Sequence, residues 1–253
     1  MGILVRNNKV ISAGGKILYS RTGDPFELPN LKLYLSATRM AQQADESLVP
    51  SFTDFSGFGY HATQATGFQP KFDTNQFGVN AGIRCDGIDD ILNLTGGALD
   101  IFRNINQFTV QALIKRSVIS SNASIIQFTQ SGSANSRFTL QFTTTSLQIA
   151  VRMLDATVTA VSVLVASNDL NAHLVQCTAI SNVIYVYVDG VLSGSATMDS
   201  ATSSNSPSAN AYAGSIPSSF GSAIINAISI NQSFSDNTTI QAQYRGYLQR
   251  GYL

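Results

Sequence analysis

The chain has 253 residues, which is enough for one large β domain or two small domains with a substantial core. Only 12% of the residues are charged, and the formal net charge is zero. This balance argues against a nucleic-acid-binding protein, because such proteins carry a basic excess that neutralises phosphates. No apolar run approaches the roughly 18 residues that a membrane-spanning helix needs, so we expect no membrane span.

Residues 1–30 form an apolar, alternating arm that ends in a linker with Pro and Gly at residues 22–30. The alternation predicts either a hairpin or an arm that becomes ordered against a neighbouring protein. Arg6, Lys9 and Lys16 interrupt the apolar residues, so the segment lacks the continuous apolar core of a secretory signal. We therefore expect a protein made in a cytoplasm without an export signal of its own.

Short strand patterns follow one another from residue 31 onward, with turn residues between most of them. They lie at residues 31–36, 80–87, 107–115, 123–129, 137–143, 146–153, 157–166, 171–179, 185–198 and 222–231. The clearest is the hairpin at 185–198, because Asp189-Gly190 is the dipeptide that a two-residue type I′ turn prefers. Many short strands with regular punctuation predict an all-β sandwich or jelly roll over residues 31–253.

Two segments have helical character. Residues 39–47 contain good helix formers but little periodicity. Residues 235–253 are the better candidate, since Ser235 or Asp236 can cap a helix whose one face carries Ile240, Tyr244, Tyr247 and Leu248. We expect a short C-terminal helix packed across the edge of the sandwich, preceded by a long polar loop at residues 199–210.

Asp86, Asp89 and Asp90 gather three carboxylates within five residues. Their oxygens can bind Ca²⁺, which takes six to eight such ligands at a flexible site. The preferred interpretation is that Asp86-Gly87 forms a turn while Asp89 and Asp90 cap it or face solvent, because the pattern lacks the ligand order of an EF-hand. We therefore expect no cofactor, with Ca²⁺ at these three residues as the alternative.

His61 and His173 are the two histidines of the chain, and Cys85 and Cys177 are its two cysteines. On a strand, His173 and Cys177 share one face but lie about 13 Å apart, too far for proton transfer between them. His173 is therefore expected to be a hydrogen-bonded strand residue. Both cysteines lie in apolar runs typical of strands, and two separate buried thiols are preferred over a disulfide.

Aromatic residues gather in the loop-like segment 54–69 and beside a second loop; they are Phe55, Phe58, Tyr60, Phe68, Tyr212 and Phe220. Aromatic faces can stack on sugar rings, which makes Phe58, Tyr60 and Tyr212 candidate glycan-binding residues. The other interpretation, which the sequence favours, is that these rings seal the edge of the sandwich.

Five segments in order carry a family resemblance: residues 54–72, 85–94, 108–116, 173–198 and 220–244. They include a His-Ala-Thr stretch at 61–63, a Cys-Asp-Gly-Ile-Asp-Asp turn at 85–90 and a Val-Asp-Gly hairpin at 188–190. Together they closely resemble the concanavalin A-like, laminin-G-type jelly rolls of phage and bacterial surface proteins. The resemblance covers residues 31–248.

The chain departs from the pattern of that family at several positions. Leu113 stands where the family usually has Trp, and Cys85 replaces the common Phe. The fold tolerates these apolar replacements, whereas a sugar site that depends on a stacking Trp does not. Glycosidases of the superfamily need two carboxyl groups beside the scissile bond. The two glutamates, Glu27 and Glu46, both precede the main strands, so no enzymatic activity is expected.

The neutral, hydroxyl-rich composition and the resemblance together predict a non-enzymatic virion protein of a phage, as a capsid decoration, head-fibre or tail-surface component. Residues 1–30 are expected to attach it to other virion proteins by adding strands to a neighbour's sheet, as a homo-oligomer or a capsid-bound chain. The alternative is a carbohydrate-binding module, formed by residues 31–253, that mediates adhesion to cell-surface glycans.

Overall fold

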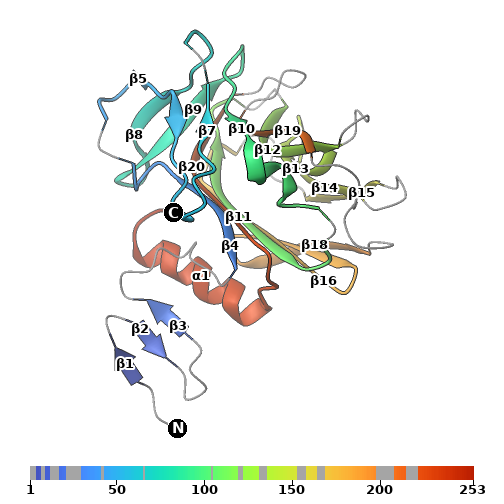
Figure 1. Cartoon of the computed structure of the whole chain (residues 1–253). Coiled ribbons are helices and arrows are strands. Elements are labelled where there is room, and N and C mark those ends of the chain that lie inside the picture. Colours follow the sequence, from blue (N-terminus) through green and yellow to red (C-terminus); the bar gives the residue numbers. More distant parts are fainter. Residues whose placement is uncertain are drawn as a thin grey trace.

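The computed structural model describes residues 4–6, 9–11, 17–20, 30–40, 43–64, 66–103, 105–118, 122–130, 136–152, 158–163, 169–197, 208–214 and 222–253. Within these residues two large antiparallel sheets form two layers, and one α-helix lies against the outer face of one layer (Figure 1). The predicted all-β sandwich with a C-terminal helix is confirmed.

The first large sheet has eight strands, and none of its strands is covered by the α-helix. Its order across the sheet is β15 (Val158–Val163), β14 (Leu147–Arg152), β13 (Ser136–Phe142), β12 (Ala123–Gln130), β19 (Ser208–Ala213), β10 (Asn93–Leu94), β7 (Ala62–Thr63) and β6 (Ser51–Phe52). A 3₁₀ turn at Gly96–Asp100 follows β10 and contacts β19.

The second large sheet has nine strands and a branch. Its order is β18 (Val191–Thr197), β17 (Val183–Val188), β16 (His173–Ile180), β11 (Phe108–Arg116), β20 (Ser222–Asn231), β9 (Asn80–Asp86), β8 (Lys71–Phe77) and β5 (Ser47–Leu48), with β4 (Leu31–Ser36) also paired to β20. The sheet branches at the long strand β20, because residues 222–225 pair with β9 and residues 227–231 pair with β4.

Three short strands in the N-terminal arm form a sheet of their own. These are β1 (Leu4–Arg6), β2 (Lys9–Ile11) and β3 (Ile17–Ser20), paired antiparallel in that order. Among the described residues they pair with no strand of the sandwich. The arm thus contains a three-stranded sheet where the sequence left a hairpin or an extended segment open.

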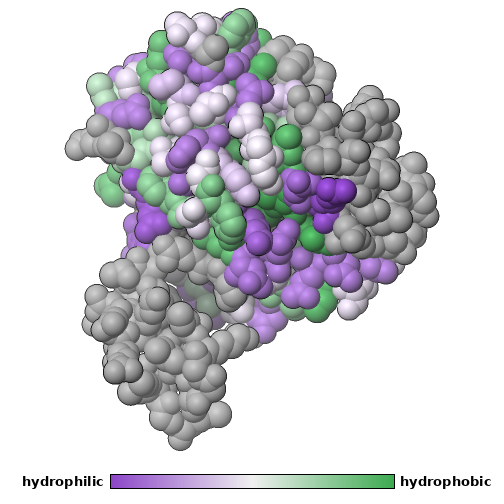
Figure 2. Space-filling view, viewed as in Figure 1, coloured by the Kyte–Doolittle hydropathy of each residue, from purple (hydrophilic) through white to green (hydrophobic). Residues whose placement is uncertain are grey.

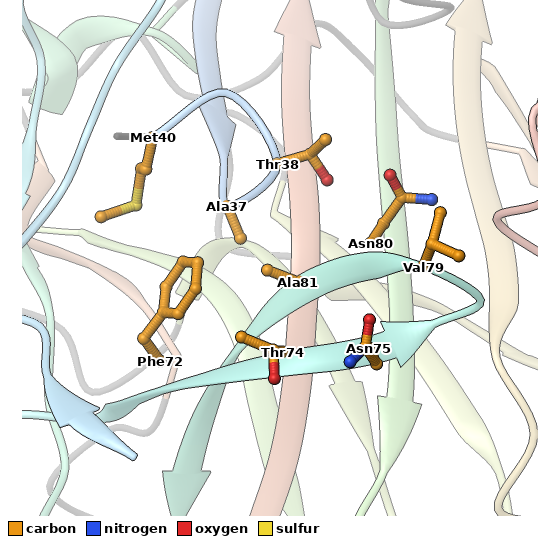
Figure 3. A pocket seen from close by; sticks show the side chains of 9 residues that line it. All are labelled: Ala37, Thr38, Met40, Phe72, Thr74, Asn75, Val79, Asn80 and Ala81. Atoms are coloured by element: carbon orange, nitrogen blue, oxygen red, sulfur yellow. The ribbon is translucent and has the colours of Figure 1, made fainter. Parts of the chain in front are cut away.

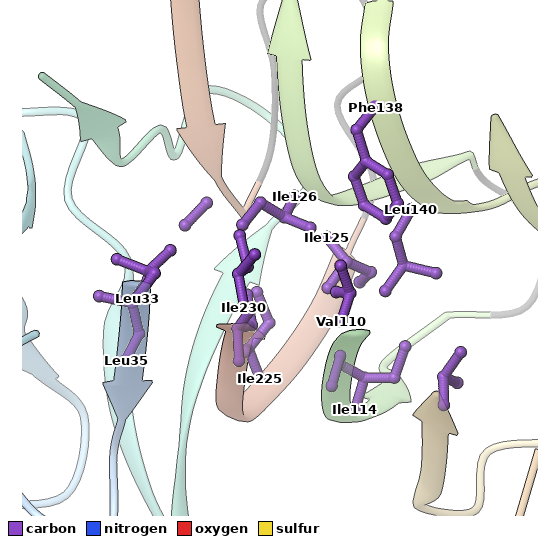
Figure 4. Close-up of a cluster of buried hydrophobic side chains, with 14 of the residues drawn as sticks. Leu33, Leu35, Val110, Ile114, Ile125, Ile126, Phe138, Leu140, Ile225 and Ile230 are labelled. Carbon is purple, nitrogen blue, oxygen red and sulfur yellow. The ribbon is translucent and has the colours of Figure 1, made fainter. Parts of the chain in front are cut away.

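The hydrophobic core fills the space between the two large sheets. Alternate residues of each strand point into it, as the period of two in a β-strand requires. Figure 4 shows this packing, in which β4, β11 and β20 contribute from one sheet and β12 and β13 from the other; the labelled residues are Leu33, Leu35, Val110, Ile114, Ile125, Ile126, Phe138, Leu140, Ile225 and Ile230.

Four phenylalanine rings form the centre of that core. The ring of Phe102 stacks on that of Phe138 with centroids 4.5 Å apart, and it meets Phe108 and Phe128 edge to face at 5.3 and 4.9 Å. Offset-stacked and edge-to-face arrangements are the favourable geometries for aromatic pairs. In this chain, which has no tryptophan, these phenylalanine rings fill the centre of the core.

Helix α1 (Asn237–Gln249) covers the outer face of the nine-stranded sheet. Ile240 and Tyr247 are fully buried, whereas Leu248 is 45% exposed, so the predicted apolar face is wrong at Leu248. The Asp236 carboxylate caps the helix by accepting the N–H of Thr239 at 2.8 Å. Between helix and sheet, buried Gln176 donates to the side chains of Gln111 and Gln243, which makes this second packing layer partly polar.

The hairpin between β17 and β18 has the predicted turn. Asp189 and Gly190 both have positive φ angles, 51° and 74°, as a type I′ turn requires. Gly190 also meets the ring of Tyr244 on α1, where a Cβ atom would come within 2.9 Å of the ring. Glycine is therefore required here both for the turn and for the approach of the helix.

Two predictions about secondary structure are wrong. Among the described residues, 39–40 and 43–47 form turns and the start of β5, without a helix. The segment has no apolar face to bury, and Glu46 adopts a positive φ of 62°, which no helix contains. The polar loop expected at 199–210 ends early, because strand β19 begins at Ser208.

None of the described helices has the length and hydrophobicity needed to span a membrane. Figure 2 shows polar and apolar residues interspersed over the described part of the face in view. Cys85 and Cys177 are both buried and form no disulfide with each other, as predicted, and burial raises the pKa of the Cys177 thiol.

Candidate functional site

Asp54 organises the loop at residues 53–61, which joins β6 to β7. One carboxylate oxygen accepts the N–H groups of Tyr34 and Ser56, each at 2.9 Å. The other accepts the Ser56 hydroxyl at 2.7 Å and the N–H of Tyr60 at 2.9 Å. Asp54 is only 6% exposed, and its own N–H donates to Nδ1 of His61 at 3.0 Å. The loop is therefore held from inside by one carboxylate.

Two aromatic rings of this loop stack on each other. The centroids of Phe58 and Tyr60 lie 5.5 Å apart with an angle of 20° between the planes. Tyr60 is partly buried against the core, and its hydroxyl packs on Gly97, where a Cβ atom would come within 2.5 Å of it. Phe58 is 50% exposed. The structure thus brings together Phe58 and Tyr60, two of the candidate glycan-binding residues, and leaves the Phe58 ring half exposed to solvent.

The edge-sealing interpretation applies to part of the aromatic segment. Phe55 lies edge-on to Tyr34 at 6.3 Å and packs against the buried cluster under α1. Phe55 and Tyr60 therefore seal the edge, whereas Phe58 and Phe68 remain about half exposed, at 50% and 47%. Phe220 lies outside the described residues.

Tyr212, the third candidate, lies on the outer face of the eight-stranded sheet. Its neighbours Ala211 and Ala213 point into the core, so its own side chain points the other way. Tyr212 pairs with Asn93 on one side and Gln127 on the other, and Asn93 pairs in turn with Thr63. Burial raises the pKa of the Tyr212 hydroxyl.

This row of Thr63, Asn93, Tyr212 and Gln127 is called the polar row below. Its amide and hydroxyl groups carry no charge, and Asn93 donates to the Gln64 side chain at 3.2 Å. Because Tyr212 is two strands away from Thr63, these residues lie about 10 Å apart. The Asp54 loop runs directly into β7 and so connects the two stacked rings with one end of the polar row.

The three acids of the second candidate site also come together. One carboxylate oxygen from each of Asp86, Asp89 and Asp90 lies within 4.8 Å of the others. Asp90 accepts the N–H of Asp86 at 2.7 Å, and Asp86 accepts the N–H of Ile88 at 2.7 Å. Burial, with repulsion from Asp86 and Asp89, raises the pKa of Asp90 to about 6. The carboxylates of Asp86 and Asp90 therefore bind the backbone of the turn, which is the arrangement that the sequence favoured.

His173 is bound between two carboxylates, as a hydrogen-bonded strand residue. Its Nδ1 lies 2.7 Å from an oxygen of Asp189, and its Nε2 lies 2.9 Å from an oxygen of Asp169. The hydrogen bond to Asp189 raises the pKa of His173 against the opposing effect of burial, and the charges of both carboxylates add to the rise. Both ring nitrogens are occupied, so His173 ties the hairpin turn to β16.

A separate hollow of about 510 Å³ opens beside the β8–β9 hairpin (Figure 3). The residues that line it are Ala37, Thr38, Met40, Phe72, Thr74, Asn75, Val79, Asn80 and Ala81. Its aromatic residue, Phe72, is only 3% exposed and offers no ring face for stacking. No sequence pattern indicates this hollow, because its walls come from three segments that the fold brings together.

Glu46, the glutamate among the described residues, already forms ion pairs with two cations. Glu46 pairs with Lys71 at 2.9 Å and also with Arg84, which holds a second carboxylate, that of Asp73, at 2.7 Å. Glu27 lies outside the described residues. Among the residues that the structure describes, Asp86, Asp89 and Asp90 form the one group of three acidic, histidine or cysteine side chains whose ligand atoms lie close enough together to hold a metal ion.

Comparison with solved structures shows the same fold in toxin binding domains. The chain matches the botulinum neurotoxin serotype D binding domain with a TM-score of 0.62 and 15% identity, covering 86% of this chain and 52% of that one. The binding domain of Paraclostridial Mosquitocidal Protein 1 matches with a TM-score of 0.65 and 12% identity, covering 86% and 52%.

A third match is a structure of botulinum neurotoxin type C, which depends on interaction with two ganglioside molecules to enter cells. Its TM-score is 0.63 at 14% identity, with coverage of 86% of this chain and 51% of that one. The chain therefore spans about half the length of these structures. No curated protein sequence matches the chain.

Identities this low show a shared fold, whereas a match to a family model shows the family. The model of the concanavalin A-like lectin/glucanases superfamily matches residues 86–225, which is more than half of the chain. The matched segment runs from the Asp86 turn through the Asp189-Gly190 hairpin into β20 and includes strands of both large sheets. The chain belongs to the concanavalin A-like lectin/glucanases superfamily.

Proposed function

We propose that the chain is a non-catalytic carbohydrate-binding domain that attaches its carrier to cell-surface glycans. The observation that carries this proposal is the half-exposed Phe58 ring on a loop that Asp54 fixes through four hydrogen bonds. A ring already held in position loses little conformational freedom when a sugar stacks on it, so less of the binding free energy is spent on ordering.

The neighbouring polar row supports the same function. Sugars present hydroxyl groups around an apolar ring face, and a few well-positioned amides and hydroxyls are what fix the orientation of such a ligand. Thr63, Asn93 and Gln127 offer donors and acceptors without the charge of an acid or a base. They follow the Phe58 loop onto the sheet that α1 does not cover, so a chain of several sugars can extend from one to the other.

The comparisons support binding over hydrolysis. Two of the matched structures are named as binding domains, and the third belongs to a toxin that depends on gangliosides, a class of glycolipid. Glycosidases use two carboxyl groups, about 5–9.5 Å apart, on either side of the scissile bond. In the described part of this chain Glu46 is held by two cations, and Asp86 and Asp90 bind the backbone of a turn.

A glycan-binding measurement with one matched pair of variants tests the proposal. Phe58→Ala is expected to weaken binding at least about tenfold, which corresponds to about 1.4 kcal/mol. Phe68→Ala is the control, since Phe68 has the same side chain and nearly the same exposure. The protein is titrated onto an array of neutral and acidic cell-surface glycans. Equal losses in both variants, or no binding by the unaltered chain, would contradict the proposal.

A virion protein held through residues 1–30 is a second candidate function, favoured by the separate sheet of β1, β2 and β3. Among the described residues, the outer strands β1 and β3 each have one edge that pairs with no other strand and that a neighbouring chain can extend. Deletion of residues 1–30 is expected to leave a folded domain of monomer mass, whereas the full chain forms a defined oligomer or joins a particle. Native mass spectrometry of both forms tests this, and full-length monomers that bind no virion protein would exclude it.

A further inference from the structure

We propose that the Phe58 platform selects saccharides that carry an anionic group, and that Lys32 is the residue that recognises the charge. This inference rests on the proposed carbohydrate-binding function and names the class of sugar. Lys32 lies on β4, and its Nζ sits 5.1 Å from the centroid of the Phe58 ring. The cation and the exposed ring thus form one contact surface.

The Lys32 ammonium has no carboxylate partner in the described part of the chain. The described carboxylates of Glu46, Asp73 and Asp100 pair with other cations, and the contact that Lys32 makes is with the face of Phe58. The acid nearest in the loop, Asp54, is buried and already accepts four hydrogen bonds. A ligand anion would therefore meet an ammonium group that no acid among the described residues neutralises.

A second cation lies on the same aromatic edge. The Arg39 guanidinium sits 5.4 Å from the ring of Tyr34 and 5.6 Å from the ring of Phe55. Because Phe55 and Phe58 belong to the same loop, Lys32 and Arg39 bring two positive charges to one loop of a chain whose net charge is zero. Two cationic side chains therefore contact the aromatic rings of this edge.

The cation–ring contact itself creates selectivity. Such a contact is worth about 0.5–1 kcal/mol at an exposed site. A neutral sugar that stacks on Phe58 must move the ammonium off the ring and gives it no new partner. An acidic sugar gives the ammonium an ion pair in exchange. Lys32 therefore hinders neutral sugars while it attracts anionic ones.

The test compares ligands that differ only in charge. Polygalacturonate is paired with its methyl ester, and dextran sulfate with dextran, so that carboxylate and sulfate are tested separately. The proteins are the full chain, Lys32→Gln, Phe58→Ala and the control Lys115→Gln. Lys115 pairs with Ile224 near one end of β20, whereas β4 pairs near the other end, so this control removes a lysine more than about 15 Å away.

The full chain is expected to bind at least one anionic ligand about fivefold more tightly than its neutral partner at low salt. The difference should vanish near 1 M salt, where the Debye length is about 3 Å. Lys32→Gln should weaken anionic binding and leave neutral binding unchanged or stronger, Phe58→Ala should weaken both, and Lys115→Gln should change neither.

Three results would overturn the inference. Equal binding of charged and neutral partners, with Phe58→Ala still defective, would reject it and leave the proposed function standing. A preference for anions that survives in Lys32→Gln would assign the charge recognition elsewhere. Equally tight, Lys32-dependent binding of polyglutamate would show that the site recognises charge without a sugar. No binding to any saccharide would reject the proposed function itself.

Discussion

Replacement of Asp54 by Ala is expected to lower the free energy of unfolding by about 3–5 kcal/mol and to abolish glycan binding. The substitution leaves the N–H groups of Tyr34, Ser56 and Tyr60 without their acceptor, and a buried unsatisfied N–H costs about 1–3 kcal/mol. The loop at residues 53–61 then loses its side-chain contact with β4 and keeps only backbone contacts such as the hydrogen bond from the Phe55 N–H to the Tyr34 carbonyl, so the Phe58 ring loses its fixed position. Urea titration and the glycan array measure the two effects.

Two variants serve as controls for Asp54→Ala. Ser56→Ala removes the hydrogen bond from its hydroxyl to the same carboxylate and the long, exposed one that the hydroxyl accepts from the Phe58 N–H at 3.3 Å, and it should cost about 1 kcal/mol with binding largely kept. Asp100→Asn removes an exposed carboxylate whose partner is Arg103, and it should change stability by less than about 0.5 kcal/mol. Stability of Asp54→Ala within about 1 kcal/mol of the unaltered chain would show that the loop does not depend on this carboxylate.

The His173 cluster is expected to make the domain less stable as the pH rises above 6.5. The pKa of His173 is raised above its ordinary 6.5, so the folded state holds a proton that the unfolded state releases near that pH. The stabilisation is complete below pH 6.5 and is lost as the pH rises through the higher folded-state pKa. His173→Gln should cost about 2 kcal/mol near pH 6 and much less near pH 8, by urea titration at each pH.

The window for this measurement ends near pH 8, because burial also raises the pKa of the Cys177 thiol above its ordinary 9.0 and gives a similar slope at higher pH. Asp169→Asn is the matched control, since it keeps the histidine and the bond to Asp189 but removes one of the two carboxylates. It should show a smaller slope than the unaltered chain. A His173→Gln variant with the full slope would show that other groups cause it.

Local patterns predicted the parts of the fold that depend on neighbours in sequence. Asp189-Gly190 predicted a type I′ turn, in which both residues have positive φ angles, and the strand patterns at residues 107–115 and 137–143 located β11 and β13. The two cysteines were correctly expected to be separate, since each lies in an apolar run that remains buried. His173 was likewise recognised as a bonded strand residue.

Local sequence patterns could not predict features that depend on segments far apart in the chain. Strands β7 and β10 have two residues each, which is too short for a periodic signal, and they are strands because β10 pairs with β19 while β7 pairs with β10 and β6. The role of Asp54 depends on Tyr34, which is 20 residues away in sequence. One local hint was present: Asp54 is followed by Ser56 and Gly57, a spacing that favours a turn stabilised by the aspartate side chain. The contact between Lys32 and Phe58 had no such hint.

The most direct test of the central claim is an NMR titration that observes the phenylalanine rings themselves. The chain has 14 phenylalanines, and with ring-labelled protein the Phe58→Ala and Phe68→Ala variants assign the two half-exposed ones. Addition of the tightest glycan from the array should shift the Phe58 signals in step with binding and leave those of Phe68 unchanged. Saturable binding that leaves the Phe58 signals unmoved would contradict the account.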